Sequence, residues 1–397
     1  MHIIRPNRSA MLFPAEKSNL GSANRSAMPG AAAMPKDLKK IGINLLSLGS
    51  SQITGTGRLL KQLLEYSPTI EDTEFLFFCQ KHFDLEGYFR IPSGLRYRRV
   101  ECPSFQSRLA RVSYEQLVLP FKAQGLEVLY SPCVANPAIH PGFRTITFIH
   151  DLTPFFVRKK YGFVQQSYVR MISRILALTS NRVITCSENS RTDLVQRLKV
   201  NASKIDIVYN SCSLKDLTTT SYGNYFLFVG TLQPGKNLPS VIRAFSLFSE
   251  KYDNADHRLV IAGAPGWGAE NYDALINELG IGSRVSFTGY ISDSELDKLY
   301  AGCKALILMS LYEGFGIPPL EALSWNKPSI VSNTSSLPEV VGRTGIQVDP
   351  MNSEQAAKAM RDIAAAPRKY LDGRDEQLSK FAPDAQARRF FTILGEC

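Results

Sequence analysis

The chain has 397 residues, which is more than one hydrophobic core usually serves, so we expect two domains of roughly 150–200 residues each. Hydrophobic residues make up 44 % of it, but no uncharged apolar run approaches the roughly 18–20 residues that cross a bilayer, which excludes a protein held by membrane-spanning helices. Of the formal net charge of +10, residues 1–40 carry +5, so the remainder is only mildly basic, and no basic stripe with interleaved aromatic residues indicates nucleic acid as a partner.

The seven cysteines lack C-x-x-C spacing, and several lie in apolar surroundings. This distribution indicates reduced thiols in a cytoplasmic protein, with neither disulfides nor a zinc site. The N-terminus lacks the continuous apolar core of a signal peptide. Residues 1–38 are rich in Ser, Ala, Asn, Pro and Met without apolar periodicity, which predicts a disordered basic tail, and Met28 and Met34 are further possible starts.

Residues 39–212 alternate short apolar runs with helical patterns. The predicted strands are 40–46, 75–79, 95–101, 127–131, 145–149, 181–186 and 205–209. The predicted helices include 59–66, 107–124 and 188–198. This alternation is typical of a doubly wound parallel sheet covered by helices.

A polar stretch at 213–224 is short of large apolar residues and predicts a linker. The alternation then resumes over 225–380. The predicted strands are 225–229, 259–262, 285–288, 305–309, 329–332 and 346–348, with helices such as 238–250 between them. We therefore expect a second doubly wound sheet, followed by a final helix within 381–397.

A lysine stands near a helix start in GTLQPGKN, residues 230–237, directly after the first strand of the second half. Lys236 in this position suits a phosphate group. A solvated lysine near a helix start is the ordinary alternative.

The segment 305–338 places a buried strand, a glycine loop, a short helix and a second strand in succession. Open α/β sheets bind ligands at the carboxyl ends of their strands, so we expect a site at this loop. Pro318 and Pro319 suit a first helical turn, so the helix should begin there. That start would carry Glu321 in the first turn and leave Glu313 on the loop.

Glycines in this loop allow its backbone to come close to a ligand, at Gly314 and Gly316. The free N–H groups of the helix start would favour an anion such as a diphosphate. Glu in a first helical turn also commonly complements the helix dipole, and this alternative stays open for Glu321.

Glu313 and Glu321 are separated by seven residues within EGFGIPPLEALSWNKPSIVS, which closely resembles the E-x7-E signature of the family-four retaining glycosyltransferases of GT-B fold. Matching pieces run from about residue 49 to residue 349, so the resemblance covers most of the chain. It implies an α/β protein with two doubly wound, Rossmann-like domains facing across a cleft. The implied parts are an acceptor-side domain, a nucleotide-sugar-binding domain and a helix that packs back across the cleft, at 39–212, 225–380 and 381–397.

The resemblance also implies roles for the matched residues. Glu313 would position the hydroxyl groups of the donor sugar, Glu321 would bind the ribose, and His150, in IHDLTPFF, would face the sugar from the other domain. Lys236 would bind the diphosphate and complete the catalytic set with Glu313 and His150. The implied nucleotide-sugar-binding residues are Gly57, Arg58, Lys236, Asn237, Gly314, Phe315, Gly316, Ile317 and Glu321. A lone histidine after a strand is more often structural, and that alternative stays open for His150.

Gly57 and Arg58 belong to a loop that lacks the complete G-x-G-x-x-G dinucleotide fingerprint, because Leu60 stands where the third glycine would be. The family commonly carries glycines and an Arg here that close over the donor diphosphate. Many members also place Arg at the positions of Thr231 and Gly235. Without those charges, the phosphate site would draw in Arg58 or backbone N–H groups.

Residues 108–120, with YEQLVLP, resemble the polysaccharide mannosyltransferase branch of the family. This implies a hexosyltransferase that moves mannose from GDP-mannose to a growing, lipid-linked polysaccharide or other glycan, as in exopolysaccharide biosynthesis. Two rivals stay open, a GT-B sugar-nucleotide epimerase and an inactive sugar-nucleotide-binding protein. Same-face attack and a covalent adduct also stay open as mechanisms.

No D-x-D motif of metal-dependent glycosyltransferases fits the chain. Asp293 and Glu295 lie in SDSELDKL, where Ser292 and Glu295 predict a helix capping box instead. We therefore expect no metal and no other cofactor. The absence of G-x-S-x-G also argues against a hydrolase.

Basic and aromatic residues gather around the helix that follows His150. They are Arg158, Lys159, Lys160, Arg170 and Arg174 beside Phe155, Phe156, Tyr161, Phe163, Tyr168 and Met171. Such a group predicts peripheral contact with the anionic inner face of the cytoplasmic membrane. A helix with a solvated basic face is the alternative.

Overall fold

The computed structural model describes residues 38–397 with four internal gaps, at 49–54, 157–162, 253–255 and 269–270. Two predictions fall on residues outside this description. They are the tail, apart from Leu38, and part of the basic and aromatic group, namely Arg158, Lys159, Lys160 and Tyr161.

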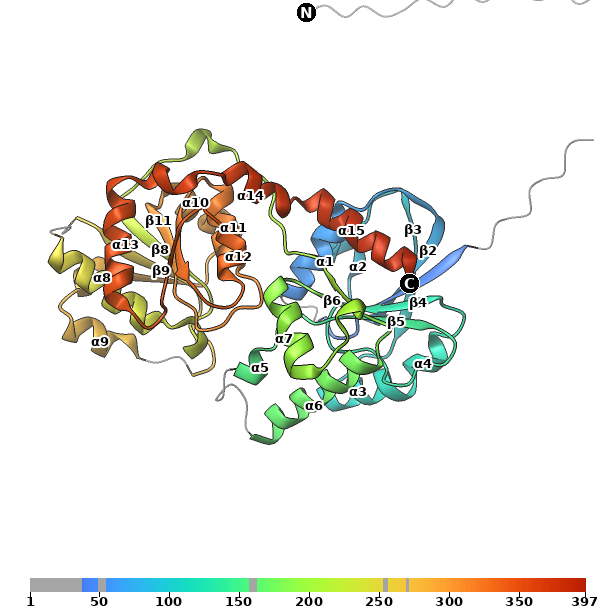
Figure 1. Cartoon of the computed structure of the whole chain (residues 1–397). Helices are drawn as coiled ribbons and strands as arrows, with labels where there is room; N and C mark the ends of the chain where they lie inside the picture. The colour runs from blue at the N-terminus through green and yellow to red at the C-terminus, as the bar shows by residue number, and fades with distance from the viewer. Residues whose placement is uncertain (1–37, 49–54, 157–162, 253–255, 269–270) are drawn as a thin grey trace, which may run out of the picture. The chain divides into compact units, whose positions relative to one another are not determined.

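The predicted α/β fold is confirmed, and the apolar runs of the first half form one parallel sheet. Within the described residues, seven strands lie in the order β3-β2-β1-β4-β5-β6-β7. Figure 1 labels β2, β3, β4, β5 and β6 of this sheet. Their bounds are β1 (Lys39–Asn44), β2 (Ile70–Gln80), β3 (Leu95–Cys102), β4 (Val128–Ser131), β5 (Arg144–Phe148), β6 (Arg182–Thr185) and β7 (Ile205–Ile207). In the register, Ile41 of β1 lies opposite Phe75 of β2 and Val128 of β4. The strand order reverses between β1 and β4, which makes this pair the topological switch point.

Helices connect these strands. They are α1 (Gly55–Glu65), α2 (Leu85–Tyr88), α3 (Arg108–Leu117), α4 (Leu119–Lys122), α5 (Thr153–Phe156), α6 (Phe163–Thr179) and α7 (Glu188–Leu198). Two predicted helices differ from the structure. The helix expected at 59–66 begins earlier, at Gly55, and the helix expected over 107–124 is broken after Leu117 because Pro120 occupies the first turn of α4.

The second half forms another parallel sheet. Within the described residues, six strands lie in the order β10-β9-β8-β11-β12-β13, with its switch point between β8 and β11. Their bounds are β8 (Tyr225–Val229), β9 (Arg258–Ala262), β10 (Val285–Gly289), β11 (Ala305–Leu308), β12 (Ser329–Ser332) and β13 (Ile346–Val348). All four residues of β11 are buried, as expected for a strand covered on both faces.

Further helices accompany the second sheet and close the chain. They are α8 (Leu238–Lys251), α9 (Tyr272–Glu278), α10 (Asp293–Gly302), α11 (Ile317–Ser324), α12 (Leu337–Val341), α13 (Ser353–Ala365), α14 (Arg374–Lys380) and α15 (Pro383–Glu396). Short 3₁₀ helices lie at η1 (Ala202–Lys204), η2 (Leu217–Thr219), η3 (Pro234–Lys236), η4 (Gly282–Arg284) and η5 (Pro367–Leu371). The predicted apolar face of α8 is confirmed, because Leu238, Val241, Ile242, Phe245 and Phe248 are all buried.

The last helix, α15, packs against the core of the first sheet. Phe391 meets Phe75 of β2 edge-on, with ring centroids 5.7 Å apart, and Phe390 meets Tyr130 of β4 at 4.9 Å. Each buried phenyl group stabilises this arrangement by about 2–3 kcal/mol. The end of the chain therefore belongs to the core formed near its beginning. Among the described residues, no helix combines the length and apolar character needed to span a bilayer.

Candidate active site

Two loops meet at the switch point of the second sheet, one after β8 and one after β11. Asn237, at the end of the first loop, has a left-handed backbone with φ of 53° and a buried side chain. Its amide nitrogen donates to the carbonyls of Met309, at 3.0 Å, and Pro350, at 2.7 Å. Asn237, predicted to bind the nucleotide sugar, thus ties the two loops together through its side chain.

This tie brings Lys236 and Glu313 together. The Lys236 ammonium lies 2.6 Å from Oε1 of Glu313, and the two side chains are only 15 % and 13 % exposed. The hydroxyl of Ser310 donates to the same carboxylate oxygen at 2.6 Å. The backbone N–H of Glu313 donates to Ser335 Oγ at 3.1 Å. The carboxylate is therefore held in one position before any ligand arrives.

The two predicted loop glycines are required for different reasons. A Cβ at Gly314 would lie 2.7 Å from the Cβ of Asp151 and 2.8 Å from the carbonyl of His150, so only glycine fits there. The Gly314 carbonyl accepts a hydrogen bond from the Ser187 hydroxyl at 2.7 Å. Gly316 has a φ of 103° and forms the N-cap of α11, a conformation that favours glycine.

Helix α11 begins at Ile317, one residue before the predicted start, because Gly316 turns the chain into it. Glu321 consequently lies in the second turn, and the prediction of a first-turn position is wrong. The alternative of a dipole-complementing Glu therefore loses its geometric basis. Pro318 and Pro319 have no N–H, so of the first three helical residues only Ile317 offers a donor to an anion.

His150 follows β5 and stacks on Phe148, with ring centroids 4.2 Å apart. Its Nε2 lies 2.9 Å from the carbonyl oxygen of Pro132. A carbonyl only accepts, so Nε2 carries the hydrogen and Nδ1 is the acceptor of the neutral ring. Burial lowers the pKa of His150, which favours this neutral form.

His150, Lys236 and Glu313 line one hollow of about 320 Å³, which we call the Glu313 cavity. Asp151 and Asn210, which the sequence did not single out, line it as well. The predicted residues Gly314, Phe315, Gly316 and Ile317 also line it. The Phe315 side chain is buried in the hydrophobic core, so this residue can serve a ligand only through its backbone.

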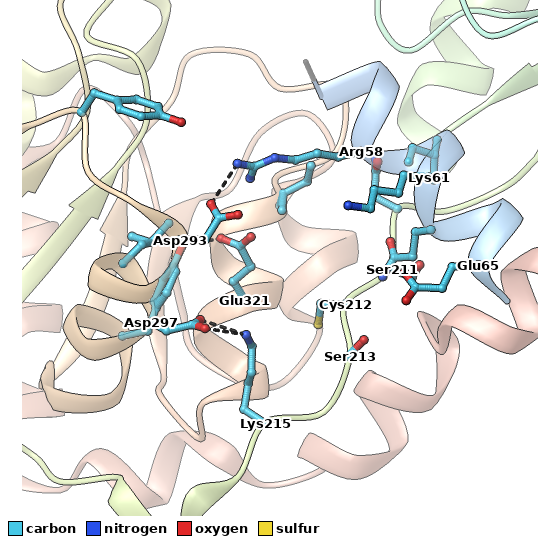
Figure 2. Close-up of a pocket in the computed structure, with 17 residues that line it drawn as sticks. Arg58, Lys61, Glu65, Ser211, Cys212, Ser213, Lys215, Asp293, Asp297 and Glu321 are labelled. Carbon is cyan, nitrogen blue, oxygen red and sulfur yellow. Dashed lines mark hydrogen bonds and ion pairs between the residues drawn. The ribbon is translucent and has the colours of Figure 1, made fainter. Parts of the chain in front are cut away.

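A larger hollow of about 620 Å³ surrounds Glu321, and we call it the Glu321 cavity (Figure 2). Oε2 of Glu321 accepts a hydrogen bond from the hydroxyl of Tyr300 at 2.8 Å. Burial raises the pKa of Glu321. Asn210 and Ile317 line both cavities, which makes the two neighbours.

Two ion pairs border the Glu321 cavity, as Figure 2 shows. Arg58 lies 3.1 Å from Asp293, and Lys215 lies 2.9 Å from Asp297. Sequence reasoning missed Lys215 and Asp297 and considered Asp293 only as a metal ligand, although the four-residue spacing of the two aspartates on α10 would place them on one helix face. The predicted capping box of α10, between Ser292 and Glu295, is confirmed.

Gly57 and Arg58 occupy different surroundings, although they are neighbours in α1. Arg58 lines the Glu321 cavity. Gly57 packs against Tyr88, where a Cβ would overlap the phenol oxygen. Gly57 therefore has a packing reason to be glycine that is independent of any ligand.

Known family models match both halves of the chain. The model of Glycosyltransferase Family 4 matches residues 71–215, and that of Glycosyl transferases group 1 matches residues 215–382. Together they cover more than three quarters of the chain. The chain belongs to the family-four glycosyltransferases of GT-B fold.

Relatives with curated names include an O-antigen chain mannosyltransferase, RfbU, of Salmonella typhimurium. It is 30 % identical over 225 residues, which cover 56 % of this chain and 62 % of the relative. O-antigen chain mannosyltransferase B of Escherichia coli is 28 % identical over 52 % of this chain and 58 % of its own length. This family-four chain thus aligns with about three fifths of each of these two relatives.

Solved structures share the fold of this family-four chain. Sucrose-phosphate synthase from Thermosynechococcus elongatus superposes with a TM-score of 0.69 at 17 % identity, over 90 % of this chain and 98 % of that one. The lipopolysaccharide outer core galactosyltransferase WaaB superposes with a TM-score of 0.66 at 17 % identity, over 91 % and 100 %. At such identities the likeness shows the fold alone.

In this family-four chain, Tyr312 holds the Glu313 loop in place. The sequence did not single this residue out. The Tyr312 hydroxyl donates to Oδ2 of Asp193 on α7 at 2.9 Å, and its ring stacks on Phe156 of α5 at 4.1 Å. Arg197 lies over the Phe156 ring, 4.1 Å from its centroid. Asp193 and Phe156 therefore fix the residue next to Glu313.

Carboxylates, histidines and cysteines do not gather as metal ligands in the part of the chain that the structure describes. No group of three such residues lies close enough there to hold a metal ion.

Proposed function

We propose that the chain is a retaining glycosyltransferase that transfers a hexose from a nucleotide sugar to a glycan acceptor. The observation that carries this proposal is the meeting of Lys236, Glu313 and His150 in one cavity, beside a second cavity that contains Glu321. A sugar fits the first set, because carboxylate and imidazole acceptors suit hydroxyl groups. A nucleoside fits the second, where the partly buried Glu321 offers acceptors for a ribose.

The proposed chemistry follows from the charges that develop when a sugar–diphosphate bond breaks. Negative charge grows on the leaving oxygen, and Lys236 would stabilise it. Loss of one such preorganised donor typically costs ~10²–10³ in rate. Glu313, which only accepts hydrogen bonds when ionised, would hold the sugar hydroxyl groups. Neutral His150 would accept a further hydroxyl hydrogen at Nδ1.

GDP-mannose is the donor we propose, and the names of the mannosyltransferase relatives support mannose as its sugar. Those names also support a growing polysaccharide as the acceptor, which we propose to be lipid-linked. Transfer is proposed to need no metal or other cofactor, with Lys236 and Arg58 as the cations nearest the diphosphate.

We further propose that the protein is cytoplasmic and touches the inner face of the membrane through α6. Met171, Ile175 and Leu178 are 54 %, 37 % and 43 % exposed and recur at helical spacing, and Arg174 lies between them. Such a face suits an interface with anionic lipid. Flotation with vesicles of anionic lipid at low salt tests this, and protein that stays at the bottom of the gradient would rule it out. A truncation lacking residues 1–36 should float equally and stay active on a soluble acceptor.

The glycosyl transfer itself is tested with purified full-length protein and a panel of nucleotide sugars. GDP-mannose should raise the melting temperature most, and NMR of the transfer product should show the anomeric configuration of the donor. Glu313→Gln is the matched control for catalysis, since it keeps the shape of the side chain. An epimerised sugar formed from donor alone would favour the epimerase, and stabilisation without turnover would favour an inactive binding protein.

A further inference from the structure

A third hollow lies beside the switch point of the first sheet. This cavity of about 330 Å³ is lined by residues 46–48 after β1, by Gln80 at the end of β2, and by residues 105–108 and Arg111 around the start of α3. We call it the Arg111 cavity. Open α/β sheets bind ligands at this edge, at the carboxyl ends of their strands. The Glu313 and Glu321 cavities use none of these residues.

The described lining of the Arg111 cavity is positively charged and contains no carboxylate. It contains Arg108 and Arg111, and no carboxylate of the described residues forms an ion pair with Arg108. The Nε of Arg111 is buried and makes no hydrogen bond to any residue that the structure describes. Ser107 caps α3 by accepting from the backbone of Ala110 at 3.2 Å, so the positive end of the helix dipole also faces this region.

The carboxyl group that pairs with Arg111 belongs to Glu115 and is buried. Glu115 is 1 % exposed, and its Oε1 lies 3.8 Å from Nε of Arg111, which is an ion-pair distance without a hydrogen bond. That oxygen has no hydrogen-bond partner among the described residues. Burial raises the pKa of Glu115 to about 7, so near neutrality the carboxyl is partly protonated and offsets the charge of Arg111 only in part.

We propose that the Arg111 cavity binds a phosphate-bearing group of the acceptor, with Arg108 and Arg111 contacting phosphate oxygens and Glu115 as the positioning residue behind Arg111. This inference rests on the proposed glycosyl transfer and names the class of acceptor, a saccharide linked through a phosphate ester or diphosphate. The distance between this cavity and His150 suits such an acceptor. Strand β4 separates β1 from β5, so the end of β1 lies about 10 Å from the end of β5, where His150 follows. A sugar attached directly to the bound phosphate would therefore lie near the Glu313 cavity, so within the proposed growing polysaccharide the acceptor is its first, phosphate-linked sugar.

Calorimetry with three probes tests the site in the full-length protein. The probes are a sugar diphosphate carrying a short prenyl chain, the same sugar 1-phosphate, and its methyl glycoside. Wild type should bind both phosphate probes about tenfold to a hundredfold tighter than the glycoside, the gain expected from hydrogen bonds to a charged group. A preference for the prenyl probe identifies a lipid-linked acceptor, and equal affinity of the two phosphates identifies a soluble sugar phosphate.

Variants inside and outside the cavity distinguish binding at the Arg111 cavity from attraction of phosphate by the overall positive charge of the protein. Arg108→Gln should abolish the advantage of the phosphate probes, and so should the double variant Arg111→Gln/Glu115→Gln, which removes both members of the pair and leaves no unpaired buried charge. Lys122→Gln on α4 removes one positive charge outside the cavity and should bind like wild type. In transfer assays the arginine variants should raise KM for the acceptor and leave kcat and GDP binding within about twofold.

The role of Glu115 has its own readout. Glu115→Gln should bind the prenyl diphosphate probe more tightly than wild type at pH 8 and equally at pH 6, because the substitution removes a charge that wild type carries only at the higher pH. The probe is a diphosphate diester and does not itself titrate there. The groups that face Glu115 are Arg108 and Arg111 of α3, Asn44 of β1 and Cys133 after β4. Burial raises the pKa of Cys133 to about 11, so it stays neutral throughout.

Unchanged binding of the phosphate probes in both arginine variants would overturn the site. In that case, slow hydrolysis of GDP-mannose by wild type would show that the glycosyltransferase proposal still stands. Absence of that hydrolysis, together with absence of GDP binding, would instead overturn the proposed function. Equal affinities of Glu115→Gln and wild type at pH 8 would remove Glu115 from the proposal.

Discussion

The ammonium nitrogen of Lys236 lies 2.6 Å from a carboxylate oxygen of Glu313, although 77 positions separate the two residues in the chain. The pair places the proposed cation for the leaving diphosphate directly against the proposed acceptor for the sugar hydroxyls. An arriving diphosphate would share the lysine with Glu313. Each of the two residues therefore affects how the other meets the donor.

Replacing Lys236 tests this sharing. Lys236→Ala should weaken binding of GDP by ~1.5–3 kcal/mol and leave guanosine binding nearly unchanged, because the proposed partner of the ammonium is phosphate. The unpaired Glu313 carboxylate would add repulsion, so the double variant Lys236→Ala/Glu313→Gln should recover part of the lost affinity. Calorimetry measures all three proteins, and unchanged GDP affinity in Lys236→Ala would contradict the phosphate role.

Glu313 and Glu321 should differ when each is replaced. Glu321→Ala should weaken nucleotide binding by ~1.5–3 kcal/mol, since a hydrogen bond to a charged group is lost. Glu313→Gln should lower kcat and nearly keep nucleotide affinity, because Glu313 is the residue proposed to hold the sugar hydroxyl groups. Titration with GDP and steady-state rates compare the two, and an equal loss of GDP affinity in both would refute the division of roles.

Tyr312 should support turnover through position alone. Tyr312→Phe keeps the ring on Phe156 but removes the hydrogen bond to Asp193, so the neighbouring Glu313 loses part of its restraint. We expect kcat to fall about twofold to tenfold, as for a net bond of about 0.5–1.5 kcal/mol, with GDP affinity unchanged. Asp193→Asn keeps an acceptor for the hydroxyl and serves as the matched control. A parallel loss of GDP affinity in Tyr312→Phe would point to a wider disturbance of the loop.

Stability should depend on pH through Glu115. Its pKa rises from 4.5 to about 7 on folding, so between these values the folded state binds more protons than the unfolded state, and stability falls as pH rises. The penalty is absent below about pH 4.5 and complete above about pH 8, where it reaches about 3 kcal/mol. Glu115→Gln should therefore gain stability over wild type at pH 8 and not at pH 4.5. Urea denaturation at both pH values measures this, and a constant difference would contradict it.

Activity should survive EDTA. The diphosphate in the proposed mechanism meets Lys236 and, in the neighbouring cavity, Arg58, so its charge is offset by side chains. Transfer rates before and after chelation should agree within error. Full loss of activity, restored by Mg²⁺ or Mn²⁺, would show that a metal ion takes part.

The sequence by itself determined the two sheets and several members of the candidate site. Short apolar runs and helical periodicity are local signals, which is why β8, β12 and β13 begin and end where predicted and the apolar face of α8 is the buried one. Glu313 and Glu321 were singled out by their resemblance to the E-x7-E signature, which lies within a single loop and helix start. The sequence did not determine the helix position of Glu321, because only the left-handed turn at Gly316 starts α11 early enough to place Glu321 in the second turn.

The tertiary structure alone decided which side chains meet. The strand order brings β8 beside β11, and this pairs Lys236 with Glu313 and turns Asn237 into a tie between their loops. The same holds for Tyr312 with Asp193, for Gly57 against Tyr88, and for α15 against the first sheet. Glu115 looks like an ordinary helical acid in the sequence, and only packing shows that it is buried. Contacts of this kind depend on how sheets order their strands and how helices dock on them, and periodicity along the chain does not encode either.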